Sequence, residues 1–252
     1  MGGFGYLRDS WRHSCSRKLM YENFVQPAII YCESNLNLCI TQPANAWTNL
    51  FFVFIGIYIF FRSRKHKNPI LKLLGPIVIL IGIFSFFYHA TSGFAGQFMD
   101  SGSMYFFSAL LIILNIHRLN TRFFTPKKLY IIFLLLVSAS LWTTFSIRTI
   151  NGINIGIPIF AIQLLTVLLL EWELHSRSTH PYKVFNLLMA LAVFSFAFAI
   201  WILDFLRMRM VGDPKFLHII NGHSTWHILN GIALIFIFHF YADLKGKRGT
   251  IK

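Results

Sequence analysis

The chain has 252 residues, of which 56% are hydrophobic and only 13% are charged, whereas soluble proteins average about 25% charged residues. This balance excludes an ordinary soluble domain and favours a membrane protein. The formal net charge of +14 could indicate a nucleic-acid partner, but the basic residues lie mainly in short connections between apolar blocks. Lys and Arg at such places orient membrane proteins and bind anionic headgroups, so we expect the lipid bilayer, and no nucleic acid, as a partner.

Residues 1–45 precede the first apolar block and contain all three cysteines of the chain. They include no continuous apolar core ahead of a cleavage site, so we expect an extramembrane or interfacial segment and no removable signal peptide. A Cys32–Cys39 disulfide requires that this segment face an oxidising compartment. The spacing of the cysteines alone leaves that pairing open.

Residues 46–241 contain seven apolar blocks, each close to the length of about 20 residues that a membrane-spanning helix needs. We therefore predict an all-α fold, a polytopic bundle of seven transmembrane helices, followed by a basic tail at residues 242–252. The predicted spans are Ala46–Phe61, Ile70–His89, Gln97–His117, Leu129–Ser146, Ile153–Leu170, Val184–Leu203 and Gly222–Tyr241.

The charges of the short loops predict the orientation of the bundle. The loop after the first span contains Arg62, Arg64, Lys65 and Lys67, and the loops after the third and fifth spans and the tail are also basic. The loop after the second span has no basic residue, and the loop after the fourth has only Arg148. Because basic loops stay on the cytoplasmic side, we expect a cytoplasmic C-terminus and an N-terminus that is outside or lumenal.

Five polar side chains in the spans are predicted to meet at one depth near the outer surface. Ser85 and His89 lie at the end of the second span, four residues apart and hence on one helix face. Asp100 lies in the first turn of the third span, and His223 and His227 share a face at the start of the seventh. Ionisable residues within membrane spans are costly and usually functional, so this group is the candidate site.

Three histidines with a carboxylate nearby are typical of a catalytic zinc site. Zinc with three protein ligands keeps one position open for water, whereas structural sites usually have four ligands. The ion lowers the pKa of that water to about 7. Asp100 could then orient a histidine or act as general base and acid, and Ser85 could hydrogen-bond the water or an oxyanion. Haem held by two histidines would leave Ser85 and Asp100 unexplained.

Ser85-x-x-x-His89, Asp100 and His223-x-x-x-His227, in this order, resemble the signature of the alkaline ceramidase family. That family belongs to a superfamily of seven-span membrane hydrolases, together with adiponectin-receptor-like and Per1-like proteins. The resemblance implies that the three histidines bind zinc and that Ser85 and Asp100 act at the catalytic water. The implied reaction is hydrolysis of the amide bond of ceramide, or a ceramide-like lipid, to a sphingoid base and a fatty acid. An ester-linked lipid substrate and a receptor-like protein with structural zinc are the alternatives.

Three further motifs extend the resemblance over roughly residues 30–230. Tyr31-Cys32-Glu33-Ser34-Asn35 resembles the Trp-Cys-Glu-x-Asn of alkaline ceramidases. Trp201 and Asp204 fit a Trp-x-x-Asp of the sixth span, for which a role towards the lipid headgroup and a merely structural ion pair are both open. Gln42-Pro43-Ala44-Asn45 resembles the form found in bacterial relatives, so we favour a bacterial inner membrane over an ER or Golgi membrane.

Animal alkaline ceramidases also carry a calcium site, built from acidic and amide groups of the N-terminal segment and the start of the first span. Glu33 and Asn35 match that pattern, and Asn45 is a further candidate ligand. Ile30 stands where an aspartate is expected, and Gln42 falls near an expected glutamate. Since calcium prefers several carboxylate oxygens, the resemblance implies Zn²⁺ as a cofactor and leaves Ca²⁺ open.

Overall fold

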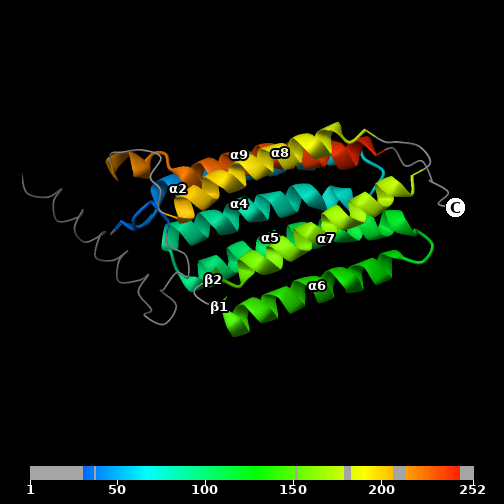
Figure 1. Ribbon diagram of the computed structural model, residues 1–252, viewed down its shortest axis with the longest axis horizontal. Helices are drawn as coiled ribbons and strands as arrows, with labels where there is room; N and C mark the ends of the chain where they lie inside the picture. The colour runs from blue at the N-terminus through cyan, green and yellow to red at the C-terminus, as the bar shows by residue number, and fades with distance from the viewer. Residues whose placement is uncertain (1–30, 37, 151–152, 179–182, 207–213, 245–252) are drawn as a thin grey trace, which may run out of the picture.

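A computed structural model describes residues 31–36, 38–150, 153–178, 183–206 and 214–244 of the chain. Residues 1–30 of the predicted interfacial segment and the tail from residue 245 lie outside these described residues. Among the described residues, seven helices are long and apolar enough to cross a membrane. The predicted all-α bundle of seven spans is therefore confirmed (Figure 1).

The spans keep the predicted order, and most of their ends shift by only a few residues. The first span consists of α2 (Pro43–Thr48) and α3 (Leu50–Ser63), and the last contains α9 (Gly222–Asp243), preceded by the 3₁₀ helix η3 (Pro214–His218). The others are α4 (Leu74–Thr91) with the 3₁₀ helix η2 (Leu71–Leu73) before it, α5 (Phe94–Leu119), α6 (Pro126–Ile147), α7 (Gly156–Ser176) and α8 (Phe185–Phe205).

The fifth span begins later than the predicted Ile153. Ile153–Asn154 form strand β2, which pairs antiparallel with β1 (Thr149–Ile150) between α6 and α7. The Asn154 Oδ1 atom accepts a hydrogen bond from the Gly156 backbone N–H at 2.7 Å, at the residue where α7 begins. Isoleucine in a short hairpin has the same hydropathy as isoleucine in a span, so the sequence pattern did not separate the two.

The helices run side by side along the long axis of the molecule (Figure 1). Helix α4 packs against α3 and α5, α5 also contacts α6 and α7, and α9 packs against α8, α3 and α2. Helix α5 is the most enclosed of the described spans, whereas α6, α7 and α8 leave most of their surface exposed. The helices that carry the candidate site residues, α4, α5 and α9, are thus each held by at least two neighbours.

Glycine allows close contact between neighbouring helices at two places. A Cβ atom on Gly56 of α3 would lie 2.7 Å from the backbone nitrogen of Ile79 in α4. A Cβ atom on Gly96 of α5 would lie 2.7 Å from the Cα atom of Tyr88 in α4. Small residues let membrane helices approach closely, and the contact at Gly96 fixes the start of α5 against the end of α4.

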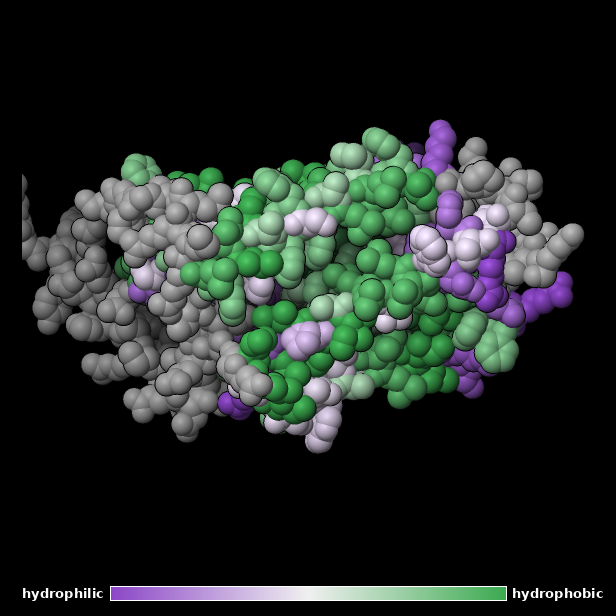
Figure 2. All heavy atoms as spheres, viewed as in Figure 1, coloured by the Kyte–Doolittle hydropathy of each residue, from purple (hydrophilic) through white to green (hydrophobic). Residues whose placement is uncertain are grey.

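Apolar side chains cover the middle of the bundle, and hydrophilic side chains gather near its end on the C-terminal side (Figure 2). Trp142 of α6 and Trp172 of α7 are 73% and 75% exposed. A surface with apolar residues this large and this exposed is typical of a protein that meets lipid. On the face shown, the surface is hollowed between α8 and α7 (Figure 2).

The described part of the N-terminal segment, up to Gln42, folds over the end of the bundle where α4 ends and α9 begins. The backbone N–H of Thr41 donates to the carbonyl of Ala90, and that of Gln42 to the carbonyl of His89, both at 3.1 Å. Tyr31 is buried, as is Glu33 two residues later. The segment predicted to be extramembrane therefore covers the candidate site.

Candidate metal centre

Three buried histidines meet at this end of the bundle, as predicted. The last turns of α4 carry His89, and the first two turns of α9 carry His223 and His227. One ring nitrogen of each lies within 4.8 Å of those of the other two. The Nε2 atoms of His89 and His223 are 3.1 Å apart, close to the roughly 3.3 Å between two nitrogens on one tetrahedral zinc with Zn–N of about 2.0–2.1 Å. The rings therefore direct nitrogens towards one point.

The tautomer of His89 is set by Gln42. The His89 Nδ1 atom lies 2.8 Å from the Gln42 Oε1 atom, and an amide oxygen can only accept a hydrogen bond. Nδ1 therefore carries the proton, and Nε2 presents its lone pair to the other two histidines. A metal-binding histidine commonly has such an acceptor on its second nitrogen, which fixes the tautomer and the ring orientation.

The tautomer of His227 follows from Thr48 in the same way. The Thr48 hydroxyl has one proton, and it lies 2.8 Å from the carbonyl oxygen of Ala44 and 3.2 Å from that of Asn45, which can only accept it. The Thr48 Oγ1 atom, 3.0 Å from His227 Nδ1, must therefore accept from that nitrogen. His227 is left with the lone pair on Nε2, as in His89.

His223 lacks this kind of support on its ring. Its backbone N–H donates to Asp204 Oδ1 at 3.3 Å, and the ring of Tyr31 lies 3.9 Å away between centroids. Its Nδ1 atom is buried and has no hydrogen-bond partner among the described residues. Three neutral imidazoles that converge out of contact with solvent form a donor set that suits zinc, so the residues fit the ion that the sequence predicts.

Ser85 and Asp100 form a polar pair near the end of α4 that carries His89. Ser85 is buried on α4, one turn before His89, and its hydroxyl lies within hydrogen-bonding reach of the half-buried Asp100 carboxylate on α5. The reversal between the helices takes two residues, of which Ser92 adopts a left-handed conformation with φ of 52°. This tight turn brings the second turn of α5 back beside α4 and places Asp100 against Ser85, one turn from His89.

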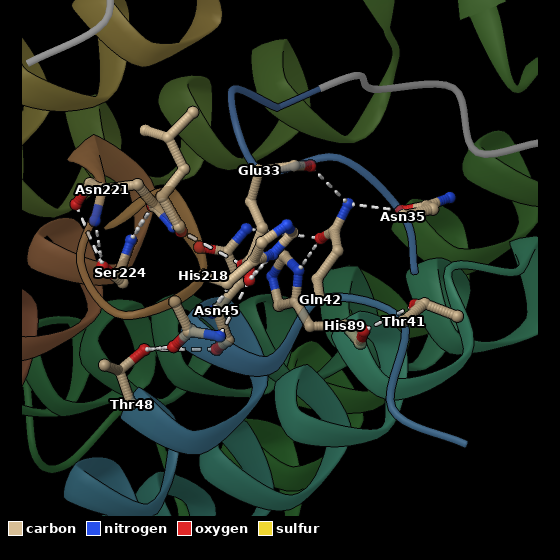
Figure 3. A network of polar contacts seen from close by, with 12 residues as sticks. Glu33, Asn35, Thr41, Gln42, Asn45, Thr48, His89, His218, Asn221 and Ser224 are labelled. Atoms are coloured by element: carbon tan, nitrogen blue, oxygen red, sulfur yellow. Dashed lines mark hydrogen bonds and ion pairs between the residues drawn. The ribbon is translucent and has the colours of Figure 1, made fainter. Parts of the chain in front are cut away.

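Glu33 anchors the N-terminal segment through hydrogen bonds (Figure 3). These bonds occupy both oxygens of the carboxylate, which a calcium ligand would need to keep available. Its Oε1 atom accepts from Ala44 N at 2.9 Å and lies 3.1 Å from His218 Nδ1. Its Oε2 atom accepts from Asn45 N at 2.9 Å and Asn221 Nδ2 at 3.4 Å. Burial raises the pKa of the Glu33 carboxyl, while its hydrogen bonds to Asn45, Ala44 and His218 act in the opposite direction.

The two asparagines predicted as possible calcium ligands are also poorly placed. Asn35 Oδ1 accepts from Gln42 Nε2 at 2.8 Å and from the Ser92 hydroxyl at 3.1 Å. Of the side-chain oxygens of Glu33, Asn35 and Asn45, Asn45 Oδ1 alone has no partner among the described residues. Calcium takes about six to eight oxygen ligands, and Ile30, at the position of an expected aspartate, lies outside the described residues. Glu33, Asn35 and Asn45 therefore do not fit a calcium ion.

Asp204 has a structural place next to the metal centre. Its carboxylate accepts from the backbone N–H groups of His223, at 3.3 Å, and Cys32, at 3.1 Å. It thus caps the start of α9 and ties the N-terminal segment to it. Trp201, one turn earlier, stacks between Phe198 and Phe205 along α8 and contacts Trp226 of α9.

The Cys32–Cys39 disulfide that the sequence left open does not form. Cys39 is disulfide-bonded, but the Cys32 thiol donates to the carbonyl oxygen of Asp204 at 3.5 Å. The thiol contact, together with the Cys32 N–H bond to the same aspartate, holds this cysteine against α8. The packing of the segment on the bundle therefore determines whether Cys32 pairs with Cys39, and the spacing of the cysteines along the chain cannot reveal that packing.

Sequence reasoning missed the two residues that set the histidine tautomers. Gln42 and Thr48 lie before and within α2, together with Asn45 and Asn49, at the start of an otherwise apolar span. These polar residues recur at intervals of three or four, which places them on one helix face. A polar face at the start of an otherwise apolar span could have indicated that α2 faces the site.

A protein-family model described as Ceramidase matches residues 25–248 of the chain. The match includes all seven spans, the three histidines, Ser85 and Asp100. A comparison with curated proteins found no match.

Proposed function

The chain belongs to the ceramidase family, and we propose that it is a zinc-dependent hydrolase that cleaves the amide bond of ceramide or a ceramide-like lipid. The observation that supports this most directly is that three histidines converge and that two of them have their tautomers already set. His89 and His227 each donate Nδ1–H to a fixed acceptor, and His223 meets His89 through Nε2 at 3.1 Å. A site with the ligand tautomers already set requires little reorganisation to bind an ion.

Asp100 would carry out the proton transfers, and Ser85 would stabilise the charge that develops on the carbonyl oxygen. A zinc ion held by the three histidines supplies an acidified water and polarises a carbonyl group. In amide hydrolysis, the water oxygen bonds to the acyl carbon, the C–N bond breaks and a proton reaches the amine nitrogen. Asp100 would accept the proton from water and deliver it to that nitrogen, and the Ser85 hydroxyl would donate to the carbonyl oxygen as it gains charge.

A lipid substrate agrees with the position of the site. The metal centre lies at the end of a bundle whose surface is mostly apolar, and one face is hollowed between α8 and α7 (Figure 2). Both chains of a ceramide lie in the bilayer, with the amide bond near the headgroup. A site near the end of the spans matches the depth of that bond.

A purely structural ion fits the arrangement less well. Structural zinc sites usually have four protein ligands, whereas the group of possible ligands among the described residues consists of three histidines. Ser85 and Asp100 are held beside that group without belonging to it. A polar pair next to an open metal position is what a hydrolase needs and a structural site does not.

The proposal is tested by incubating the purified protein with ceramide and measuring the sphingoid base and the fatty acid by mass spectrometry. We expect equal release of both products, abolished by phenanthroline and restored by added zinc. A lipid with the same two chains joined through an ester serves as the comparison substrate. Faster cleavage of the ester would contradict the amide preference. If neither lipid is cleaved in a metal-dependent way, the proposed hydrolase activity is contradicted.

A further inference from the structure

Gln42 connects the N-terminal segment to the metal centre through both ends of its amide group (Figure 3). Its Oε1 atom accepts the Nδ1–H of His89 at 2.8 Å. Its Nε2 atom donates to Asn35 Oδ1 at 2.8 Å and lies 3.5 Å from the Glu33 backbone oxygen. The NH₂ group of Gln42 therefore lies between two oxygens that both carry negative partial charge.

We propose that the Gln42 amide takes the place of a calcium ion in this chain, so that protein groups alone hold the N-terminal segment over the metal centre and orient His89. A cation would draw the oxygens of Asn35 and Glu33 together by its charge. The two N–H groups of an amide do the same by hydrogen bonding, without the ion. This inference goes beyond hydrolysis and concerns which metals the protein needs in order to fold.

Hydrogen bonds stabilise the buried Glu33 carboxylate without a metal. An isolated buried carboxylate is costly, and here four N–H groups surround it, from two backbone amides, one asparagine and one imidazole. The imidazole belongs to His218 of η3, and the Asn221 amide belongs to the start of α9. Because each carboxylate oxygen already accepts two hydrogen bonds, a cation would have to displace donors that come from three separate elements.

The remaining oxygens are too few for calcium. Asn35 Oδ1 already accepts from Gln42 and from Ser92. Asn45 Oδ1 is the one side-chain oxygen of the three candidate ligands without a partner among the described residues. Calcium requires about six to eight oxygens, so a single amide oxygen cannot hold it.

The first experiment measures the thermal unfolding of the zinc-loaded wild-type protein in EGTA buffered with free zinc, and then in excess calcium. We expect the same Tm in both, because no ion contributes to the segment. A Tm that falls in EGTA and recovers saturably with calcium, but not with magnesium, would overturn the proposal.

The second experiment introduces Gln42→Glu, which keeps an acceptor for His89 but removes both N–H donors. We expect the Tm to fall in EGTA, because four oxygens now meet without a cation. It should rise saturably with calcium, because the new carboxylate adds negative charge and water molecules can complete the set of oxygen ligands. Gln163→Glu is the matched control, since Gln42 and Gln163 are equally buried at 6% exposure and Gln163 bonds only Ser108 and Ser140 among the described residues.

The control should lose stability without a calcium response. A Gln42→Glu protein that folds but whose Tm does not change with calcium would contradict the proposal that the Gln42 amide takes the place of the ion. If that variant does not fold, the wild-type comparison still decides. Neither readout depends on lipid turnover, so the result is independent of the proposed hydrolase activity.

Discussion

The imidazoles of His89 and His227 depend on acceptors from outside the helices that carry them. His89 of α4 relies on Gln42, and His227 of α9 relies on Thr48 of α2. The first turns of the first span therefore prepare ligands that belong to the second and seventh spans. Such acceptors matter energetically, because their loss typically weakens metal binding or activity by about tenfold to a hundredfold.

We predict that Thr48→Val weakens zinc binding by about tenfold to a hundredfold, because valine has the shape of threonine but cannot accept the Nδ1–H of His227. Competition with a zinc chelator, followed by mass spectrometry of the retained metal, measures the change. Thr166→Val is the control, since the hydroxyl of the half-buried Thr166 bonds, among the described residues, only the carbonyl of Ile162 in its own helix. Equal zinc retention in both variants would show that Thr48 does not support the site.

At the scale of single residues, the sequence predicted the functional side chains better than their supports. Ser85, His89, Asp100, His223 and His227 could be found because ionisable groups stand out in apolar spans and helix direction gives their depth. Gln42 and Asp204 could not be assigned, because a glutamine amide or a capping aspartate acts through neighbours that only the packed structure supplies. Glu33 was read as a possible calcium ligand for the same reason, since its four donors come from distant parts of the chain.

Between elements, the approach of α5 to α4 decides whether Asp100 reaches Ser85. The two helices touch at Gly96, where a Cβ atom would lie 2.7 Å from Tyr88 Cα. Asp100 follows Gly96 by one turn on the same helix face. The histidines lie on α4 and α9, which both pack against α2 and α3, whereas α5 packs against α4, α6 and α7, so the two halves of the site can be separated experimentally.

We predict that Gly96→Ala lowers the rate of ceramide hydrolysis by one to two orders of magnitude while zinc content stays unchanged. The added methyl group pushes α5 away from α4, and a displacement of about 1 Å at a catalytic group can cost about a hundredfold. Rate and zinc content are measured on the same preparation. Gly102→Ala is the control, because there a Cβ atom would meet only the end of the Leu141 side chain, at 3.1 Å. A loss of zinc in Gly96→Ala, or an equal loss of rate in the control, would contradict this division.

The elements themselves could largely be predicted, since each span is a long apolar block bounded by charged or turn residues. The β1–β2 hairpin could not, because its isoleucines continue the apolar pattern of α7. The separate helix α2 was also missed. Its polar residues were interpreted as the boundary of the first span. In the structure the helix begins at Pro43, and the backbone N–H groups of Ala44 and Asn45 in its first turn donate to Glu33.

For the whole molecule, the seven spans place the two ends of the bundle on opposite sides of the membrane, and the loop charges predict which side is which. We predict that green fluorescent protein fused after the C-terminus fluoresces in intact bacterial cells, because basic loops keep that end in the cytoplasm. Alkaline phosphatase fused at the same place should be inactive. The reverse pattern would place the metal centre on the cytoplasmic side.

The most direct test of the account measures zinc content and ceramide hydrolysis together, on the wild-type protein, His223→Ala and Asp100→Asn. We predict one zinc per wild-type chain, loss of zinc and activity in His223→Ala, and retained zinc with activity lost in Asp100→Asn. That combination would assign the histidine to the metal and the aspartate to proton transfer. A wild-type protein that contains no zinc, or an Asp100→Asn variant that hydrolyses ceramide at the wild-type rate, would contradict the central claim.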